Sequence, residues 1–169
     1  LRAERLSQDP CALDAVLATS LAQRDAVWRI RDSIPQAQKH EGASIKHDVS
    51  VPVAALPEFV TRASAWVAGN VPDARLVAYG HVGDGNLHFN VNQPPGGSAD
   101  AFMARRGEIQ RAIYDIALDM RGSFSAEHGI GRFKVGELER YRSPVELDLM
   151  RTLKRALDPK GILNPGKVL

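Results

Sequence analysis

Hydrophobic residues recur along the chain with two different periods, which indicates that strands and helices are mixed. Alternating or short apolar runs predict strands at residues 44–53, 74–81, 86–91 and 123–129. Hydrophobic residues three and four positions apart predict helices at residues 10–34, 55–70, 101–120, 131–141 and 144–157. Pro35 is expected to end the first helix, because proline lacks the backbone N–H that a helix interior needs.

The order of these elements predicts the fold class. Strand, helix, strand, strand, helix and strand follow one another over residues 44–129, which is the split βαβ arrangement. We therefore expect an α+β fold: a ferredoxin-like antiparallel sheet with helices on one face, followed by C-terminal helices. No repeat, low-complexity tract or linker interrupts the sequence, so residues 1–169 are expected to form one domain.

Composition and charge exclude several classes of protein. The 169 residues, 44% hydrophobic and 25% charged, suffice for one globular domain with a core. The 22 basic and 20 acidic residues leave a net charge of +2 without a basic stripe, so nucleic acid is not expected as a partner. The single Cys11 excludes an intramolecular disulfide and is typical of a reducing compartment. No apolar run approaches the ~20 residues of a membrane span, so we expect a cytoplasmic protein.

Two of the five histidines, His81 and His88, flank one glycine-rich turn in the stretch YGHVGDGNLHFNV (residues 79–91). If residues 84–85 are the centre of a two-residue hairpin turn, His81 lies directly opposite His88, with β-carbons about 4.5–5.5 Å apart. Asn90 falls on the same face as His88, because side chains alternate along a strand. This spacing suits two imidazoles that bind one metal ion. The alternative is that both histidines lie on an open sheet surface and bond to neighbours or water.

A third candidate ligand, Glu127, lies in the stretch SAEHGIGRFK. One carboxylate and two imidazoles form a ligand set for zinc-like divalent ions that leaves positions open for a substrate. Gly129 and Gly131 allow the backbone to approach a ligand closely or to adopt positive φ. The alternative is that Glu127 is a surface carboxylate paired with Arg132 or Lys134.

Three long motifs carry a family resemblance: GHVGDGNLHFNV, SAEHGIGRFK and LKRALDPKGILNPGKVL. In this order and spacing they resemble the C-terminal domain of the FAD-linked oxidases of the vanillyl-alcohol-oxidase type, close to members that oxidise D-2-hydroxyglutarate, D-lactate or glycolate. The resemblance runs from about Trp28 to Leu169. It implies a cap domain whose ferredoxin-like sheet covers the flavin of an FAD held by a separate, upstream domain.

The resemblance also implies roles for individual residues. It assigns metal ligation to His81, His88 and Glu127, with zinc as the expected ion. It places His128 next to the substrate, where an imidazole suits the role of general base. Asn90 is expected to form a hydrogen bond to the substrate.

Two cations are expected to orient the substrate carboxylate. The stretch WRIRDSI resembles the family segment that grips this carboxylate with an arginine, which falls on Arg31, and SIKHD supplies Lys46. The alternative is that both are solvated charges on a helix end and a strand. Ser33 and Pro35 stand where some relatives offer a threonine hydroxyl to the distal part of the substrate. Because of this departure, the substrate can be lactate, glycolate or a larger acid as well as a five-carbon dicarboxylate.

The implied function is oxidation of a small D-2-hydroxy acid to the 2-oxo acid, with hydride transfer to FAD and reoxidation by an electron acceptor that the sequence does not identify. A metal on the substrate hydroxyl would lower its pKa. The chain begins at Leu1 rather than Met and shows no glycine-rich pyrophosphate-binding segment, so we expect a fragment that is inactive alone. The alternatives are a stand-alone metal-binding domain with another role and an interaction domain without redox activity.

Overall fold

The computed structural model describes residues 16–169, and Cys11 lies outside these residues. The chain divides into two compact units, Leu1–Glu41 and Gly42–Leu169, which are described separately. The assignment of the whole chain to one domain stays a prediction. Among the described residues, no helix is both long enough and apolar enough to cross a membrane.

The N-terminal unit contains the helix α2 (Leu21–Ala37). It begins after Ser20, whose hydroxyl accepts a hydrogen bond from the backbone N–H of Gln23, the usual way of capping a first turn. The predicted start of this helix at residue 10 lies outside the described residues, but residues 16–20 are not helical and the helix ends at Ala37 rather than at residue 34. Pro35 lies inside the last turn and costs one backbone hydrogen bond, and the helix ends shortly after it.

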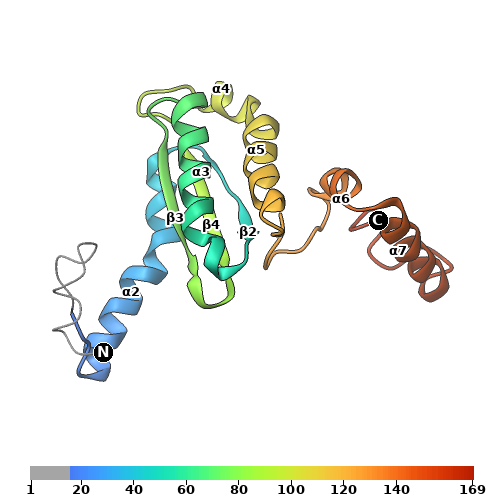
Figure 1. Cartoon of the computed structure of the whole chain (residues 1–169), viewed down its shortest axis with the longest axis horizontal. Helices are drawn as coiled ribbons and strands as arrows, with labels where there is room; N and C mark the ends of the chain where they lie inside the picture. The colour runs from blue at the N-terminus through green and yellow to red at the C-terminus, as the bar shows by residue number, and fades with distance from the viewer. Residues whose placement is uncertain (1–15) are drawn as a thin grey trace. The chain divides into compact units, whose positions relative to one another are not determined.

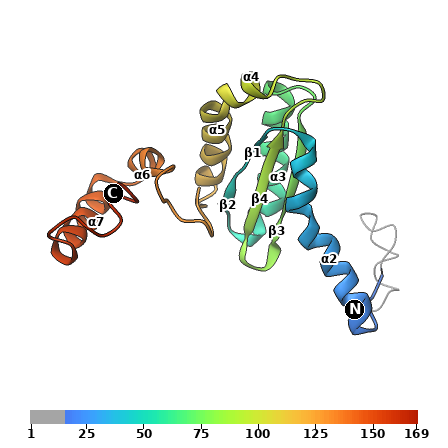
Figure 2. The ribbon, with the colours of Figure 1, turned by 180° about the vertical axis from the view of Figure 1, so that it is seen from behind.

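The C-terminal unit is built on a four-stranded antiparallel sheet. Its strands are β1 (Ser44–Ile45), β2 (Asp48–Ser50), β3 (Arg75–His81) and β4 (Asn86–Asn92). The central strand β4 pairs with β3 on one side and with β1 and β2 on the other, as Figure 2 shows from behind. The predicted strand at residues 44–53 is thus interrupted. The predicted strand at residues 123–129 is reduced to one bridge, Ser50 to Ser123, at the outer edge of β2.

Five helices belong to this unit. They are α3 (Leu56–Asn70), α4 (Ala99–Ala104), α5 (Arg106–Asp119), α6 (Val135–Tyr141) and α7 (Pro144–Leu157). Short 3-10 turns are η1 (Gln38–Glu41) in the N-terminal unit and η2 (Val53–Ala55) and η3 (Val82–Asp84) in the C-terminal unit. The predicted helix at residues 101–120 is broken at Arg105. Figure 1 shows α3 and α5 side by side on one face of the sheet, so the predicted α+β class is confirmed.

The core lies between the sheet and these two helices. On β4 the odd residues Leu87, Phe89 and Val91 are buried against α3 and α5. The ring of Phe89 meets that of Phe59 on α3 edge to face, with centroids 5.8 Å apart, and a buried side chain of this size contributes about 1.5–3 kcal/mol. Because side chains alternate along a strand, the even residues of β4 project to the opposite, polar face.

The hairpin between β3 and β4 differs from the predicted two-residue turn. Its loop is η3 followed by Gly85, which has φ of 75°. His81 consequently faces Asn86, and Tyr79 faces His88. The prediction that His81 lies directly opposite His88 is wrong, because the loop is longer. The register differs by two residues, so both histidines remain on the same face.

Candidate functional site

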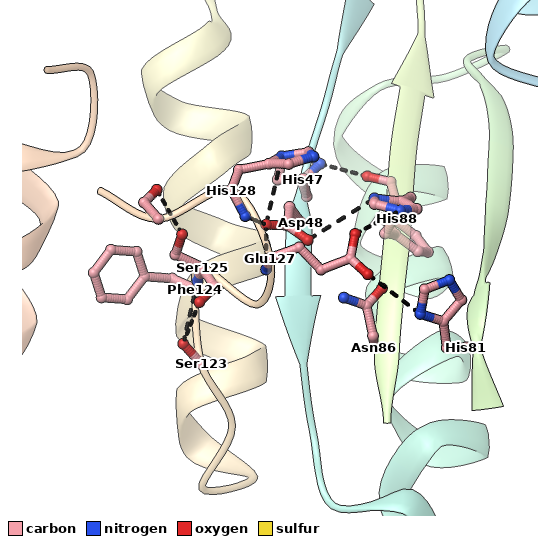
Figure 3. Close-up of polar contacts among 12 residues, drawn as sticks. His47, Asp48, His81, Asn86, His88, Ser123, Phe124, Ser125, Glu127 and His128 are labelled. Atoms are coloured by element: carbon pink, nitrogen blue, oxygen red, sulfur yellow. Dashed lines mark hydrogen bonds and ion pairs between the residues drawn. The ribbon is translucent and has the colours of Figure 1, made fainter. Parts of the chain in front are cut away.

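Two histidines of the hairpin lie near the carboxylate of Glu127. His81 stands at the end of β3 and His88 lies diagonally from it on β4. Oε1 of Glu127 lies 3.2 Å from Nδ1 of His81, and Oε2 lies 3.5 Å from Nε2 of His88. Figure 3 shows the Glu127 side chain reaching from its loop toward both rings. The structure therefore places Glu127 beside each of the other two sequence-predicted metal ligands.

His128 joins the cluster from the same loop. Its ring stacks on that of His88, with centroids 5.7 Å apart and an angle of 21° between the planes. Its Nδ1 lies 3.4 Å from Oδ2 of Asp48, so this nitrogen faces a carboxylate. The side chain is 66% exposed. Nε2 is therefore the ring atom left to act on a bound molecule.

Asp48 is a member of the cluster that the sequence interpretation missed. It pairs with His88 across β2 and β4, and its side chain is 3% exposed. Burial acts to raise the pKa of this carboxyl, but hydrogen bonds from the backbone N–H groups of His128 and Glu127 outweigh it and hold the pKa below its usual value. Alternation along SIKHDVSVPV could have revealed it, because Asp48 stands two positions after the predicted site residue Lys46 and residues two apart on a strand share a face.

Four residues of this cluster could hold one ion together. Possible ligand atoms of Asp48, His88, Glu127 and His128 all lie within 4.8 Å of one another. His81 lies outside this set but contacts Glu127 directly. Two or three imidazoles with one or two carboxylates are ligands that zinc and similar divalent ions prefer.

The alternative reading of Glu127 as the partner of Lys134 does not match the contacts. Nζ of Lys134 donates instead to the carbonyl of Phe124 at 3.1 Å and to Oγ of Ser125 at 3.0 Å. Both contacts hold the segment that leads to Glu127. Gly129 has the positive φ that its sequence context suggested, 68°.

The remaining candidates are placed as follows. Asn90 is buried on β4, on the same face as His88, at 2% exposure. Lys46 lies exposed between β1 and β2. Arg31 is half-buried on α2, in the N-terminal unit. The substrate-binding roles of these three residues stay predictions.

Comparison with known proteins agrees with the motifs. The family model described as "FAD linked oxidases, C-terminal domain" matches residues 2–168. A D-2-hydroxyglutarate dehydrogenase of Stutzerimonas stutzeri is 37% identical over 156 residues, which are 92% of this chain and 33% of that protein. The mitochondrial D-2-hydroxyglutarate dehydrogenase of Arabidopsis thaliana is 40% identical over 157 residues, 92% of this chain and 26% of that protein. The corresponding protein of Rattus norvegicus is 38% identical over 168 residues, 98% of this chain and 30% of that protein.

The chain thus spans about a quarter to a third of the length of these relatives. The resemblance drawn from the three motifs is confirmed by a family model that covers nearly all residues. The chain belongs to the family of C-terminal domains of FAD-linked oxidases.

Proposed function

We propose that this domain binds a divalent metal ion and a small D-2-hydroxy acid, and that the full-length protein oxidises this acid to the 2-oxo acid with FAD. The observation that carries the proposal is the position of the Glu127 carboxylate, whose two oxygens lie 3.2 and 3.5 Å from ring nitrogens of His81 and His88. The names of the relatives, D-2-hydroxyglutarate dehydrogenase, support the class of substrate.

The residues present fit a divalent ion. Ligand atoms of Asp48, His88, Glu127 and His128 lie within 4.8 Å of one another. Our candidate ligands are His88 and Glu127 of this set together with His81, which stands outside it but has Nδ1 3.2 Å from the Glu127 carboxylate. Two imidazoles and one carboxylate are the ligands of a catalytic zinc site with positions left for a substrate. The buried Oδ1 of Asp48 has no hydrogen-bond partner among the described residues, and it lies 3.9 Å from Nδ1 of His88. A buried carboxylate oxygen without a hydrogen-bond partner favours a cation nearby, since burial of its negative charge is costly otherwise. When bound, the metal supplies a positive charge that favours loss of the hydroxyl proton.

His128 is the residue that would take this proton. Its Nδ1 faces Asp48, so Nε2 is the basic atom, and the exposed ring can reach a molecule placed over the polar face. Asp48 favours the tautomer with a proton on Nδ1, because the negative Oδ2 of its carboxylate lies 3.4 Å from that nitrogen. Removal of the proton by a fixed base lowers the barrier to hydride loss from the adjacent carbon.

The substrate carboxylate needs a fixed cation, and Arg31 and Lys46 are our candidates for this role. A guanidinium holds a carboxylate with two parallel hydrogen bonds, so Arg31 would orient the acid and Lys46 would add charge. Asn90, on the same face as His88, would donate from its amide to an oxygen of the acid.

FAD would accept the hydride in the full-length protein. Among residues 16–169 the glycines of the GHVGDGN motif lie in a hairpin between two strands, rather than between a strand and a helix. That arrangement does not fit a pyrophosphate, so we assign no residue here to FAD and expect an upstream domain to bind it. The electron acceptor has no assignment. A cytoplasmic location stays a prediction, and the relatives from Arabidopsis thaliana and Rattus norvegicus carry mitochondrial names.

The proposal is tested in the full-length protein with D-2-hydroxyglutarate, D-lactate and glycolate and a dye as acceptor. At least one acid should be oxidised, and His128→Ala should lower kcat by about 10²–10⁴-fold. His40→Ala is the matched control, since His40 is an exposed histidine on η1, and it should keep full kcat. Absence of turnover with every acid, or full kcat in His128→Ala, would overturn the proposal.

A further inference from the structure

The loop of residues 123–129, which carries Glu127 and His128, lies against one residue of β2. We propose that Asp48 is a positioning residue: it binds three consecutive backbone N–H groups of this loop and thereby directs the side chains of Glu127 and His128 toward His88. The inference deepens the proposed function and rests on it, because it assigns Asp48 a role in the same site.

The contacts of Asp48 with the loop are specific. Its backbone carbonyl accepts a hydrogen bond from the N–H of Ala126 at 3.1 Å. Its carboxylate atom Oδ2 accepts from the N–H of Glu127 at 2.9 Å and from the N–H of His128 at 2.8 Å. A single residue thus satisfies three donors in a row, two of them with a charged acceptor that makes the stronger kind of hydrogen bond.

The local backbone explains why the loop needs this anchor. Ser123 still pairs with Ser50 through two backbone hydrogen bonds of 3.0 and 2.8 Å, as in a strand. Beyond this bridge the loop leaves the ladder, and the carboxylate of Asp48 takes the place that the backbone carbonyls of a neighbouring strand would occupy. The two residues held in this way are the ones whose side chains enter the cluster (Figure 3).

Asp48 is itself fixed in place. It is buried and stands opposite His88 in the register of β2 and β4, so the strand that holds the loop also sets the distance to that histidine. Its two oxygens have different contacts: Oδ2 accepts the hydrogen bonds from the loop N–H groups, and Oδ1 has no hydrogen-bond partner in the described part of the chain. A competing role is direct metal ligation through Oδ1, and the substitutions below separate the two.

The test compares Asp48→Ala and Asp48→Asn with the parent 169-residue chain, by hydrogen exchange of single amides. In Asp48→Ala the amides of Glu127 and His128 should exchange about 10–100-fold faster, since each loses a charged acceptor. The amide of Ala126 should change little, because its acceptor is the backbone oxygen of residue 48. In Asp48→Asn the side-chain oxygen still accepts, so protection should largely return.

A zinc titration of the same variants reads out the effect on the site. Asp48→Ala should weaken zinc binding about 10-fold or more, and Asp48→Asn should stay within a few-fold of the parent, because a held loop keeps Glu127 in place. The inference would be overturned if Asp48→Asn and Asp48→Ala lost zinc binding equally while Asp48→Asn kept its amide protection. That result would show that Asp48 is a metal ligand rather than a positioning residue.

Three further outcomes complete the test. Equal exchange of the Glu127 and His128 amides in the parent and in Asp48→Ala would also overturn the inference. If Asp48→Ala unfolds, seen as lost protection of the Phe89 amide on β4, Asp48→Asn decides alone: retained protection supports the inference and lost protection contradicts it. A parent chain that binds no zinc would contradict the proposed function, and the exchange data would still report on the loop.

Discussion

The buried imidazole of His47 predicts that the domain loses stability as the pH falls. His47 is 1% exposed and meets the ring of Tyr114 edge to face, with centroids 5.7 Å apart. Its Nδ1 donates to the carbonyl of Phe89, and its Nε2 has no hydrogen-bond partner among the described residues. Protonation would therefore place a positively charged ring in the core, away from water. Burial first, and then the positive charges of Lys134 and Arg106, outweigh the raising effect of the backbone at Phe89 and Ile109 and lower the pKa of His47 to about 4.

The sign and size of the effect follow from this pKa. An unfolded histidine titrates near 6.5, so between pH 6.5 and 4 the unfolded chain takes up a proton that the folded chain does not. The contribution of His47 to the free energy of unfolding is fully present above pH 6.5. It falls as the pH drops from 6.5 to 4 and is constant below pH 4, and the total loss is about 3 kcal/mol.

The assay is urea denaturation from pH 7.5 to 4 of the parent and of His47→Phe, which keeps an aromatic ring but does not titrate. The free energy of unfolding of the parent should fall by about 3 kcal/mol more than that of the variant. If His47→Phe does not fold at pH 7.5, His47→Gln replaces it, since its amide can donate to the Phe89 carbonyl. Parallel pH profiles of parent and variant would refute the reasoning.

Two further substitutions test the turn and the substrate cation. Gly85→Ala should lower the free energy of unfolding, measured by urea denaturation, by at least about 1–3 kcal/mol. Residue 85 has φ of 75°, and an added β-carbon would lie 2.0 Å from the carbonyl oxygen of Val51. Gly83→Ala is the control, because an added β-carbon there meets no atom within 4 Å, and equal losses in the two variants would contradict the reasoning. In the full-length protein Arg31→Ala should raise KM for the acid more than it lowers kcat, and Arg31→Lys should rescue only in part because an ammonium lacks the planar fork. An unchanged KM for every acid in Arg31→Ala would remove Arg31 from the substrate site.

Elements with local signals could be predicted from the sequence. Helix α7 has the predicted bounds because its start is encoded within four residues: the Ser143 hydroxyl and the Glu146 carboxylate cap each other's backbone N–H groups, and Pro144 opens the first turn. The strands β3 and β4 followed from alternation. The prediction that His81 and His88 share one face is correct although the predicted register is wrong, because a shift of two residues keeps each side chain on the same face.

The features that could not be predicted depend on distant residues. The hairpin loop is set partly by Val51, whose N–H donates to the carbonyl of Gly85 at 3.1 Å, and no local pattern reveals that contact. The segment after Ser123 has a strand-like sequence, but the Asp48 carboxylate takes its amides and prevents a longer strand. Helix α2 continues past Pro35 because a proline so close to a helix end removes only one hydrogen bond.

The central claim is that His81, His88 and Glu127 hold one divalent ion, and calorimetric titration of zinc into the 169-residue chain tests it most directly. We predict about one equivalent bound by the parent and by His40→Ala, and loss of most of this binding in His88→Ala, whose side chain lies 3.5 Å from the Glu127 carboxylate. Equal zinc binding by His88→Ala and the parent would contradict the account.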